Sequence, residues 1–446
     1  MQHTRARQAQ DVPQRYSTDV LVVGGGFAGV CAAVSAAETG ANVILLERNG
    51  RGGGNFTNSF VGTFCGYHVV EEEEYKLICS GLGEQVFSHL IKENALGRYI
   101  TYAKVPVIPF DIPVLTRFLD QMLLEAKVKV LFRQLVSDVI VEDNRVTSVI
   151  VTDKSGQYSI ACKTVIDCSG DGDVAFMAGV PMLTDGGHIQ FPSMIFQMGG
   201  LNVEEASKTT KKELAEYQRQ AVESGDFDLP RKDGTVSLLP RQGMAQANMG
   251  RIKIGDRPID VFNLEELSYG EMEGRRQSFM YLEFLKKYVP GYENAYICGL
   301  PNTVGIRESR RMRGQYVLTK EDFLAAQKFE DGIACSSWPV EFHKAGALTE
   351  WAYLPEGEYI EVPMRSLIPE EIENLLFAGR CLSADQTSHA AVRCGPVCMA
   401  MGEAAGIAAA ELSKSDGKVQ DIDGVKIREA MKARGAHFRK DESKTK

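Results

Sequence analysis

The sequence predicts an α/β protein organised around a parallel sheet. Three observations in residues 19–49 support this: an apolar run at 19–23, a glycine-rich turn followed by small apolar residues, and a second apolar run at 42–46 that stops at an acid. A strand that is buried on both faces appears as a continuous apolar run. Two parallel strands need a crossover between them, usually a helix. We therefore expect a strand, a helix and a second strand in this order.

The turn carries Gly24, Gly26 and Gly29 at the spacing G-x-G-x-x-G, and the helix is expected at residues 27–39. In a Rossmann-like unit the first glycine permits the tight turn and the second lets a pyrophosphate approach the backbone, while the third lets helix and strand pack closely. Free amides and the helix dipole favour an anion there. A glycine turn without a ligand is the alternative, which the flanking strand, helix and acid disfavour.

Glu47 follows Gly29 by 18 positions and ends the second strand. An acid at this place accepts hydrogen bonds from the ribose hydroxyls of a dinucleotide. A second glycine cluster, RGGGNFTN at 51–58, follows directly. Here the sequence resembles FAD-dependent oxidoreductases of the glutathione-reductase-like and fumarate-reductase-like flavoproteins, whose Gly-Gly segment packs under the ribityl chain and ring of the flavin.

The resemblance spans residues 18–413 and is most specific near its end. There the chain has the strand NLLFAGR (374–380), the loop CLSADQTSHAAVRCGP and a small-residue helix at 397–413. In these flavoproteins the helix points its N-terminus at the pyrimidine carbonyl of the flavin. The resemblance therefore implies noncovalently bound FAD as the cofactor.

Residues 129–168 contain three strand-like runs with turn signals at 143–144 and 155–156, which predict a β-meander. The meander ends in DCSGDGD (167–173), which resembles the second flavin-binding segment, and Val136 corresponds to the residue whose backbone contacts the adenine. The motif and the resemblance together assign the following residues to FAD: Gly24, Gly26, Phe27, Ala28, Gly29, Glu47, Arg48, Gly53, Gly54, Asn55, Val136, Ser169, Gly170, Gly379, Arg380, Pro396, Val397 and Cys398.

The rest of the chain is divided by changes of pattern. Residues 59–109 are expected to form loops and helices whose aromatic residues are mostly core, and helical spacing marks 111–127, 202–224 and 268–288. The expected divisions are a disordered N-terminus (1–17), the first part of the FAD-binding domain (18–180), a mixed α+β substrate domain (181–361), the C-terminal part of the FAD-binding domain (362–413) and a polar tail (414–446).

Two groups of residues are candidates for catalysis. The resemblance places His389 and Arg393 beside the flavin, His389 as an acid or base and Arg393 as an anion clamp; alternatively His389 bonds the backbone. Arg307 and Arg310 belong to a basic cluster that either binds an anionic group or pairs with acids such as Glu308. His188 and His343 are weaker candidates, and Arg311 and Arg313 are the other arginines of the cluster.

Composition limits location and partners. The formal net charge of −9 argues against nucleic acid or an anionic membrane as a partner, and no apolar run reaches transmembrane length. The ten cysteines form no C-x-x-C pair, and the N-terminus lacks an apolar signal core, so a reducing cytoplasm is expected and no metal site. The expected partner is a small-molecule substrate, and a homo-oligomer or an electron-transfer partner is compatible with the sequence.

We therefore expect an FAD-dependent oxidoreductase that transfers a hydride between FAD and a small, anionic or neutral, organic substrate. A flavin-dependent monooxygenase is the first alternative, although AGRCLSAD stands where such hydroxylases place a Gly-Asp-Ala-Ala-His type segment. The second alternative is a flavoprotein subunit of a larger electron-transfer complex. No second G-x-G-x-x-G appears, so a separate nicotinamide domain is not expected.

Overall fold

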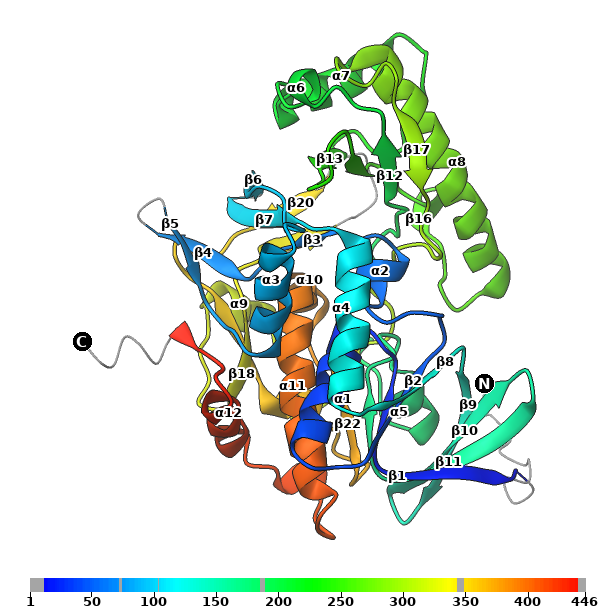
Figure 1. Ribbon diagram of the computed structural model, residues 1–446, viewed down its shortest axis with the longest axis vertical. Coiled ribbons are helices and arrows are strands. Elements are labelled where there is room, and N and C mark those ends of the chain that lie inside the picture. Colours follow the sequence, from blue (N-terminus) through cyan, green and yellow to red (C-terminus); the bar gives the residue numbers. More distant parts are fainter. Residues whose placement is uncertain (1–11, 72–73, 103, 185–188, 343–348, 440–446) are drawn as a thin grey trace.

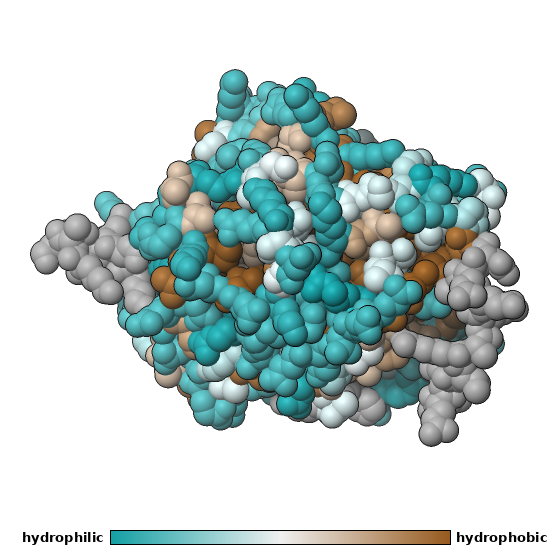
Figure 2. All heavy atoms as spheres, turned by 90° about the horizontal axis from the view of Figure 1, so that it is seen from below, coloured by the Kyte–Doolittle hydropathy of each residue, from teal (hydrophilic) through white to brown (hydrophobic). Residues whose placement is uncertain are grey.

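The computed structural model describes residues 12–71, 74–102, 104–184, 189–342 and 349–439, and these residues form two lobes (Figure 1). The lower lobe holds the main sheet, and the upper lobe holds a smaller sheet beside a long helix. No helix within the described residues is long and apolar enough to cross a membrane. The face in Figure 2 is mainly hydrophilic, with apolar side chains in separate small patches.

The main sheet has seven strands in the order β8-β2-β1-β11-β10-β9, with β22 also paired to β11. Strands β8, β2, β1, β11 and β22 pair in parallel, whereas β9, β10 and β11 form an antiparallel meander. This confirms the predicted fold class. The strands are β1 (Gln14–Val23), β2 (Val43–Glu47), β8 (Lys129–Phe132), β9 (Leu135–Glu142), β10 (Arg145–Asp153), β11 (Gly156–Asp167) and β22 (Leu375–Phe377).

The meander leaves the parallel sheet and returns to it within one strand. The first part of β11 pairs with β10, and its last residues, from Val165 to Asp167, pair with β22. Asp143 and Asn144 join β9 to β10 with φ values of 47° and 60°, as tight hairpin turns require. The return of β11 therefore brings the segment after Asp167 to the same edge of the sheet as the turn after β1.

Helices α1 (Phe27–Glu38) and α11 (Gly395–Leu412) lie side by side in the lower lobe (Figure 1). Their backbones touch: a Cβ on Gly402 would lie 2.0 Å from the carbonyl oxygen of Ala28, and one on Gly406 would lie 2.2 Å from that of Ala32. Only glycine fits at such distances, which explains the run of small residues. Helix α4 (Ile112–Glu125) begins as predicted, with Asp111 as its N-cap.

Both chain ends are more ordered than expected. Strand β1 already begins at Gln14, so residues 14–17 belong to the sheet and not to a disordered N-terminus, because they pair with β11. Residues 418–439, predicted as part of a polar tail, contain η3 (Val419–Asp421) and α12 (Gly424–Ala433). Met431 and Phe438 are buried in the core of the lower lobe, which fixes this segment. Residues 1–11 and 440–446 lie outside the described part.

Residues 59–109 contain short strands that the sequence analysis did not predict. Of the aromatic residues there and just beyond, Phe60, Phe64, Tyr67 and Phe110 are buried, as expected for core, whereas Tyr99 is 39% exposed. The side chain of Tyr102 is outside the described part. The elements are α2 (Asn55–Asn58), β3 (Thr63–Phe64), β4 (His68–Glu71), β5 (Glu74–Leu77), α3 (Leu82–Lys92), β6 (Ile100–Tyr102) and β7 (Val105–Pro109); α5 (Asp173–Ala178) follows β11.

The upper lobe has a four-stranded sheet in the order β13-β14-β12-β17. The segment expected to be helical at 202–224 forms two helices, α6 and α7, because a capping box at Thr210 starts a new helix. The elements of this lobe are β12 (Phe196–Gly199), α6 (Val203–Ala206), α7 (Lys211–Glu223), β13 (Thr235–Leu238), β14 (Ala245–Asn248), β15 (Lys253–Ile254), β16 (Arg257–Pro258), α8 (Leu264–Tyr288) and β17 (Tyr296–Gly299).

Part of the segment that was expected to form the substrate domain belongs to the lower lobe. Ile333, Ala334 and Ile360 pack in the same buried core as α1 and α11, because their strands cover the outer side of α11. The remaining elements are α9 (Lys320–Leu324), β18 (Gly332–Ser336), β19 (Val340–Phe342), β20 (Glu350–Ala352), β21 (Ile360–Pro363), η2 (Met364–Leu367) and α10 (Gln386–Val392).

Candidate functional site

A cavity of about 1330 Å³ extends from the turn after β1, through the lower lobe, to β13 and β14 of the upper lobe. Its volume exceeds the roughly 300–1,000 Å³ that is typical of pockets for drug-sized ligands. It opens at the carboxyl ends of β1 and β2, where α/β sheets bind their ligands. The cavity therefore has room for a dinucleotide and a second molecule.

The three glycines of the motif have the distinct roles that the spacing predicts. Gly24 has a φ of 99°, and a Cβ there would lie 2.3 Å from the carbonyl oxygen of Cys168. A Cβ on Gly29 would lie 1.7 Å from the carbonyl oxygen of Gly24, so this glycine serves packing and does not line the cavity. A Cβ on Gly26 would have only the Cα of Gly54 within 4 Å, at 3.9 Å, and Gly26 borders the cavity.

Glu47 is 5% exposed and is held by hydrogen bonds from two directions. One carboxylate oxygen accepts the amide proton of Gly25 at 2.7 Å, and the other accepts that of Asn49 at 2.7 Å. Glu47 also lines the cavity. A carboxylate fixed in this way presents remaining acceptor positions to the cavity, which fits the predicted contact with a ribose.

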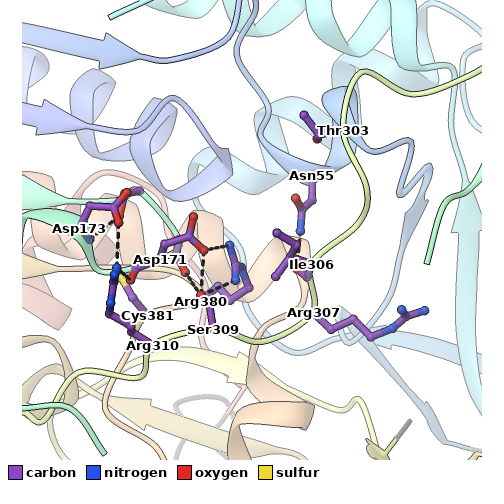
Figure 3. Close-up of polar contacts among 12 residues, drawn as sticks. Asn55, Asp171, Asp173, Thr303, Ile306, Arg307, Ser309, Arg310, Arg380 and Cys381 are labelled. Atoms are coloured by element: carbon purple, nitrogen blue, oxygen red, sulfur yellow. Dashed lines mark hydrogen bonds and ion pairs between the residues drawn. The ribbon is translucent and has the colours of Figure 1, made fainter. Parts of the chain in front are cut away.

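The second glycine cluster lies against the first. The Gly53 amide donates to the carbonyl oxygen of Gly25 at 2.7 Å, and a Cβ on Gly54 would lie 3.0 Å from the Cα of Gly26. Asn55 donates to the carbonyl oxygen of Ile306 at 2.9 Å (Figure 3). These contacts hold three segments of the cavity wall together: the two glycine clusters and the distant segment that contains Ile306.

A charged network closes the cavity beside the turn after β11. Arg380 donates to Asp171 at 2.8 Å and to Ser309 at 2.7 Å (Figure 3). Arg48 lies 3.3 Å from Asp171. Burial raises the pKa of Asp171, but Arg380 and Arg48 outweigh it and hold that pKa at about 2. The network fixes Arg380, which lines the cavity together with Ser169 and Gly170.

Most of the residues that were predicted to bind FAD line the cavity. Pro396 and Val397 do not line it, because Val397 is fully buried and Pro396 faces away, while their neighbours Cys394, Gly395 and Cys398 do. The predicted residues that line the cavity are Gly24, Gly26, Phe27, Ala28, Glu47, Arg48, Gly53, Gly54, Asn55, Val136, Ser169, Gly170, Gly379, Arg380 and Cys398.

His389 is not in the position that the resemblance implied. Its side chain is fully buried, does not line the cavity and donates from Nε2 to the carbonyl oxygen of Arg380 at 2.7 Å. Burial, with Arg393 and Arg311 nearby, lowers the pKa of His389 well below its usual range. The prediction that His389 is an acid or base is corrected, and its alternative, a bond to the backbone, is what the structure has.

The predicted role of Arg310 as a residue of the catalytic site is also corrected. Its guanidinium lies 2.9 Å from a carboxylate oxygen of Asp173 and over the rings of Phe176 and Phe262, and it does not line the cavity (Figure 3). Arg311 pairs with Glu308 at 3.3 Å. Arg310 and Arg311 thus form ion pairs with acids, which was the alternative that the sequence left open.

Arg307 and Arg393 line the cavity together. Arg307 donates to the carbonyl oxygen of Phe191 at 2.8 Å, and Arg393 to the side-chain oxygen of Gln190 at 3.2 Å. Figure 3 shows Arg307 pointing away from the Asp171 network. Burial, then the nearby Arg231, lowers the pKa of Arg307 to about 9, with Arg393 and Arg251 adding to the effect.

Several wall residues were missed by the sequence analysis. They come from the turn between β8 and β9, from separate segments of the upper lobe and from the region of β19, and no motif or spacing connects them. His188 and His343 lie outside the described residues. The missed residues include Gln134, Lys211, Gln246, Asn248, Trp338 and Glu341.

The sheet topology, the glycine turn and the fixed acid define a dinucleotide-binding α/β protein. The sequence model of the family "FAD dependent oxidoreductase" matches residues 19–431, and the chain belongs to this family. The protein is accordingly an enzyme that uses FAD. The narrower placement among glutathione-reductase-like flavoproteins stays a prediction.

Similarity to individual proteins is more limited. A stretch of 39 residues is 51% identical to digoxin reductase from Eggerthella lenta. This stretch spans 9% of this chain and 7% of that protein. The structure is similar to a geranylgeranyl bacteriochlorophyll reductase-like protein from Thermoplasma acidophilum, with 14% identity, 94% and 83% of the two chains covered and a TM-score of 0.46. It is also similar to L-proline dehydrogenase from P. horikoshii, with 12% identity, 94% of this chain and 99% of that chain covered, and a TM-score of 0.44.

Proposed function

We propose that the protein transfers a hydride between noncovalently bound FAD and a small anionic organic substrate whose negative group is held by Arg307 and Arg393. The observation that carries this proposal is the presence of both arginines in the wall of the FAD cavity. Bound FAD supplies the hydride chemistry. The protein's own residues then bind and orient the substrate.

The charge around these arginines favours an anion. Arg231 and Arg251 lie near Arg307, and the resulting repulsion contributes to its lowered pKa. Glu341 acts in the opposite direction and also lines the cavity. The Nε atom of Arg393 is buried and has no hydrogen-bond partner within the described residues. A carboxylate bound between Arg307 and Arg393 would offset the local positive charge.

The location and assembly of the enzyme remain part of the proposal. All ten cysteines are free in the structure, which supports a reducing compartment, and we propose the cytoplasm. A homo-oligomer or an electron-transfer partner remains compatible with the chain.

The test is a substrate screen followed by paired variants. Carboxylic acids that bleach the flavin anaerobically are compared with their methyl esters, in the wild type and in Arg307→Ala and Arg393→Ala. Each variant is expected to lower kcat/KM for the acid by about tenfold to a hundredfold, the range of a lost charge-assisted hydrogen bond, and to leave the ester nearly unchanged. Arg219→Ala, an exposed arginine of α7, is the control.

Three results would contradict the proposal. Equal losses for acid and ester in both variants would show that the arginines do not recognise the negative group. Oxygen consumption coupled to NAD(P)H, with a hydroxylated product, would replace hydride transfer by monooxygenation. Activity that appears only after a second protein is added would instead favour the role of a subunit in a larger complex.

A further inference from the structure

Two cysteine sulfurs touch in the wall of the FAD cavity. The Sγ atoms of Cys65 and Cys394 are 3.4 Å apart, and both residues line the cavity. Cys65 directly follows β3, and Cys394 is the N-cap of α11, so the fold brings together two residues that are 329 positions apart. None of the motifs or ion pairs of the FAD site uses this pair.

The surrounding backbone holds the two segments together. A Cβ on Gly66 would lie 3.5 Å from the Cβ of Cys394, so the backbone after Cys65 packs directly against the second cysteine. The carbonyl oxygen of Gly66 accepts the amide proton of Ser337, and the hydroxyl of Ser336 donates to the carbonyl oxygen of Ala391 at 2.7 Å. The sulfurs need to approach by about 1.4 Å to reach the ~2.05 Å of a disulfide.

We propose that Cys65 and Cys394 form a reversible disulfide, which is a second two-electron redox centre beside FAD. The substrates of this centre are low-molecular-weight disulfides and thiols. Oxidation of the two thiols releases two electrons and two protons, and reduction of the disulfide takes them up. Reduced FAD also releases two electrons when it returns to its oxidised form, so one disulfide can exchange its electrons with one FAD.

Exposure assigns the roles of the two sulfurs. Cys65 is half-buried and faces the cavity, whereas Cys394 is 7% exposed. Burial, with the adjacent Cys65, raises the pKa of the Cys394 thiol, so Cys394 stays protonated in the dithiol. The more exposed Cys65 therefore gives up its proton as it attacks an incoming disulfide, and the first thiolate that is expelled takes up this proton. The Cys394 sulfur then attacks Cys65, gives up its proton and expels the second thiolate, so that two thiols leave.

A second cysteine pair provides a contrast. Cys79 and Cys335 also lie close enough to interact, but they are 3% and 2% exposed, and neither lines the FAD cavity. A third cysteine of the cavity wall, Cys398, directs its sulfur at the carbonyl oxygen of Arg393 at 3.5 Å. Cys398→Ser is thus a matched control for mapping the disulfide in FAD-free protein, since it removes a cavity sulfur without touching the proposed pair. Because Cys398 belongs to the residues assigned to FAD, Cys298→Ser, at an exposed position outside the cavity wall, is the control for measurements with bound FAD.

The first test maps the disulfide in protein from which FAD has been removed. Wild type and Cys398→Ser are equilibrated anaerobically in mixtures of oxidised and reduced glutathione, alkylated, digested and analysed by mass spectrometry. We expect a peptide pair linked through Cys65 and Cys394 in both proteins, which disappears as reduced glutathione rises. Absence of this linkage at every ratio, or a link through Cys398 in place of Cys394, overturns the proposal. The wild-type result does not depend on the folding of any variant.

The second test counts electrons in the FAD-loaded protein, oxidised beforehand with oxidised glutathione and then desalted. Anaerobic titration with dithionite should require four electrons per FAD in wild type and Cys298→Ser, but two in Cys65→Ser and Cys394→Ser. A wild-type endpoint at two electrons overturns the exchange with FAD. Neither test uses the organic substrate, so failure of the proposed substrate chemistry does not affect the outcome.

Discussion

The Gly53 amide donates a hydrogen bond of 2.7 Å to the carbonyl oxygen of Gly25, and this bond joins the two glycine clusters of the cofactor site. An isolated parallel bridge between Gly26 and Gly53 accompanies it. The two clusters therefore behave as one structural unit, with Gly26 and Gly54 facing each other at the cavity. Side chains are absent from this contact, which leaves the backbone open to a pyrophosphate.

Gly26→Val is expected to abolish the retention of FAD while the protein still folds. The added Cβ meets only the Cα of Gly54 within 4 Å, at 3.9 Å, and the valine methyl groups then occupy cavity space where a pyrophosphate would lie. The visible absorbance of the purified variant measures bound flavin, and circular dichroism measures folding. A folded variant with stoichiometric FAD would remove the basis of the cofactor assignment.

Gly24→Val is the informative comparison for that variant. A Cβ at Gly24 would lie 2.3 Å from the carbonyl oxygen of Cys168, and the φ of 99° disfavours any side chain. This variant should misfold whether or not FAD is present. Similar behaviour of the two variants would contradict the separate roles of the glycines.

Glu403→Gln should remove a pH dependence of stability. Burial raises the pKa of Glu403 to about 7, whereas in the unfolded chain a glutamate has a pKa of about 4.3. Between these values the folded protein binds more protons, so the free energy of unfolding falls as pH rises through the range from about 4.3 to about 7, by about 4 kcal/mol in total. The glutamine oxygen can still accept the amide proton of Leu82.

Urea unfolding of both proteins, saturated with FAD at pH 5, 6, 7 and 8, measures this effect. The stability of the variant relative to the wild type should increase from pH 5 to pH 8 by about 2.5 kcal/mol, because part of the loss in the wild type has already occurred at pH 5. Parallel stability curves across this range would show that Glu403 keeps the same protonation state in the folded and unfolded chain.

His389→Ala should lower stability without changing the pH profile of turnover near neutrality. The imidazole is neutral there because burial, with Arg393 and Arg311 nearby, holds its pKa far below its usual range. The variant loses the 2.7 Å bond to Arg380, at a cost of about 1–3 kcal/mol in the free energy of unfolding. The profile of kcat/KM between pH 6 and 8 is the measurement, and loss of an ionisation near pH 6.5 would restore the catalytic role.

The cofactor end of the site was predictable because it is encoded locally. Gly24, Gly26 and Glu47 belong to one βαβ unit, where backbone conformation and spacing determine the contacts. The substrate end was only half predictable. Arg307 and Arg310 stand three positions apart in one basic run, yet one lines the cavity and the other pairs with Asp173.

The residues that the sequence analysis missed depend on tertiary contacts. Asn248 and Trp338 reach the cavity from different lobes, and nothing in their local sequence distinguishes them from other strand or loop residues. The contact between Cys65 and Cys394 is equally non-local, since it forms only when α11 packs under the loop after β3. The prediction of a catalytic role for His389 was wrong for a related reason. His389 is near the cofactor loop in sequence, but its helix α10 directs its side chain into the core.

The protein should lack a tight nicotinamide site. The sequence has one G-x-G-x-x-G, and its turn lies in the cavity assigned to FAD. The four strands of the upper-lobe sheet pair in an antiparallel manner, so the described part of this lobe offers no second βαβ unit. Anaerobic stopped-flow mixing with NADH or NADPH should give slow flavin reduction whose rate rises linearly with concentration, while dithionite reduces the flavin at once. A fast reduction that saturates with either nucleotide would contradict this prediction and would indicate a second nucleotide pocket in the upper lobe.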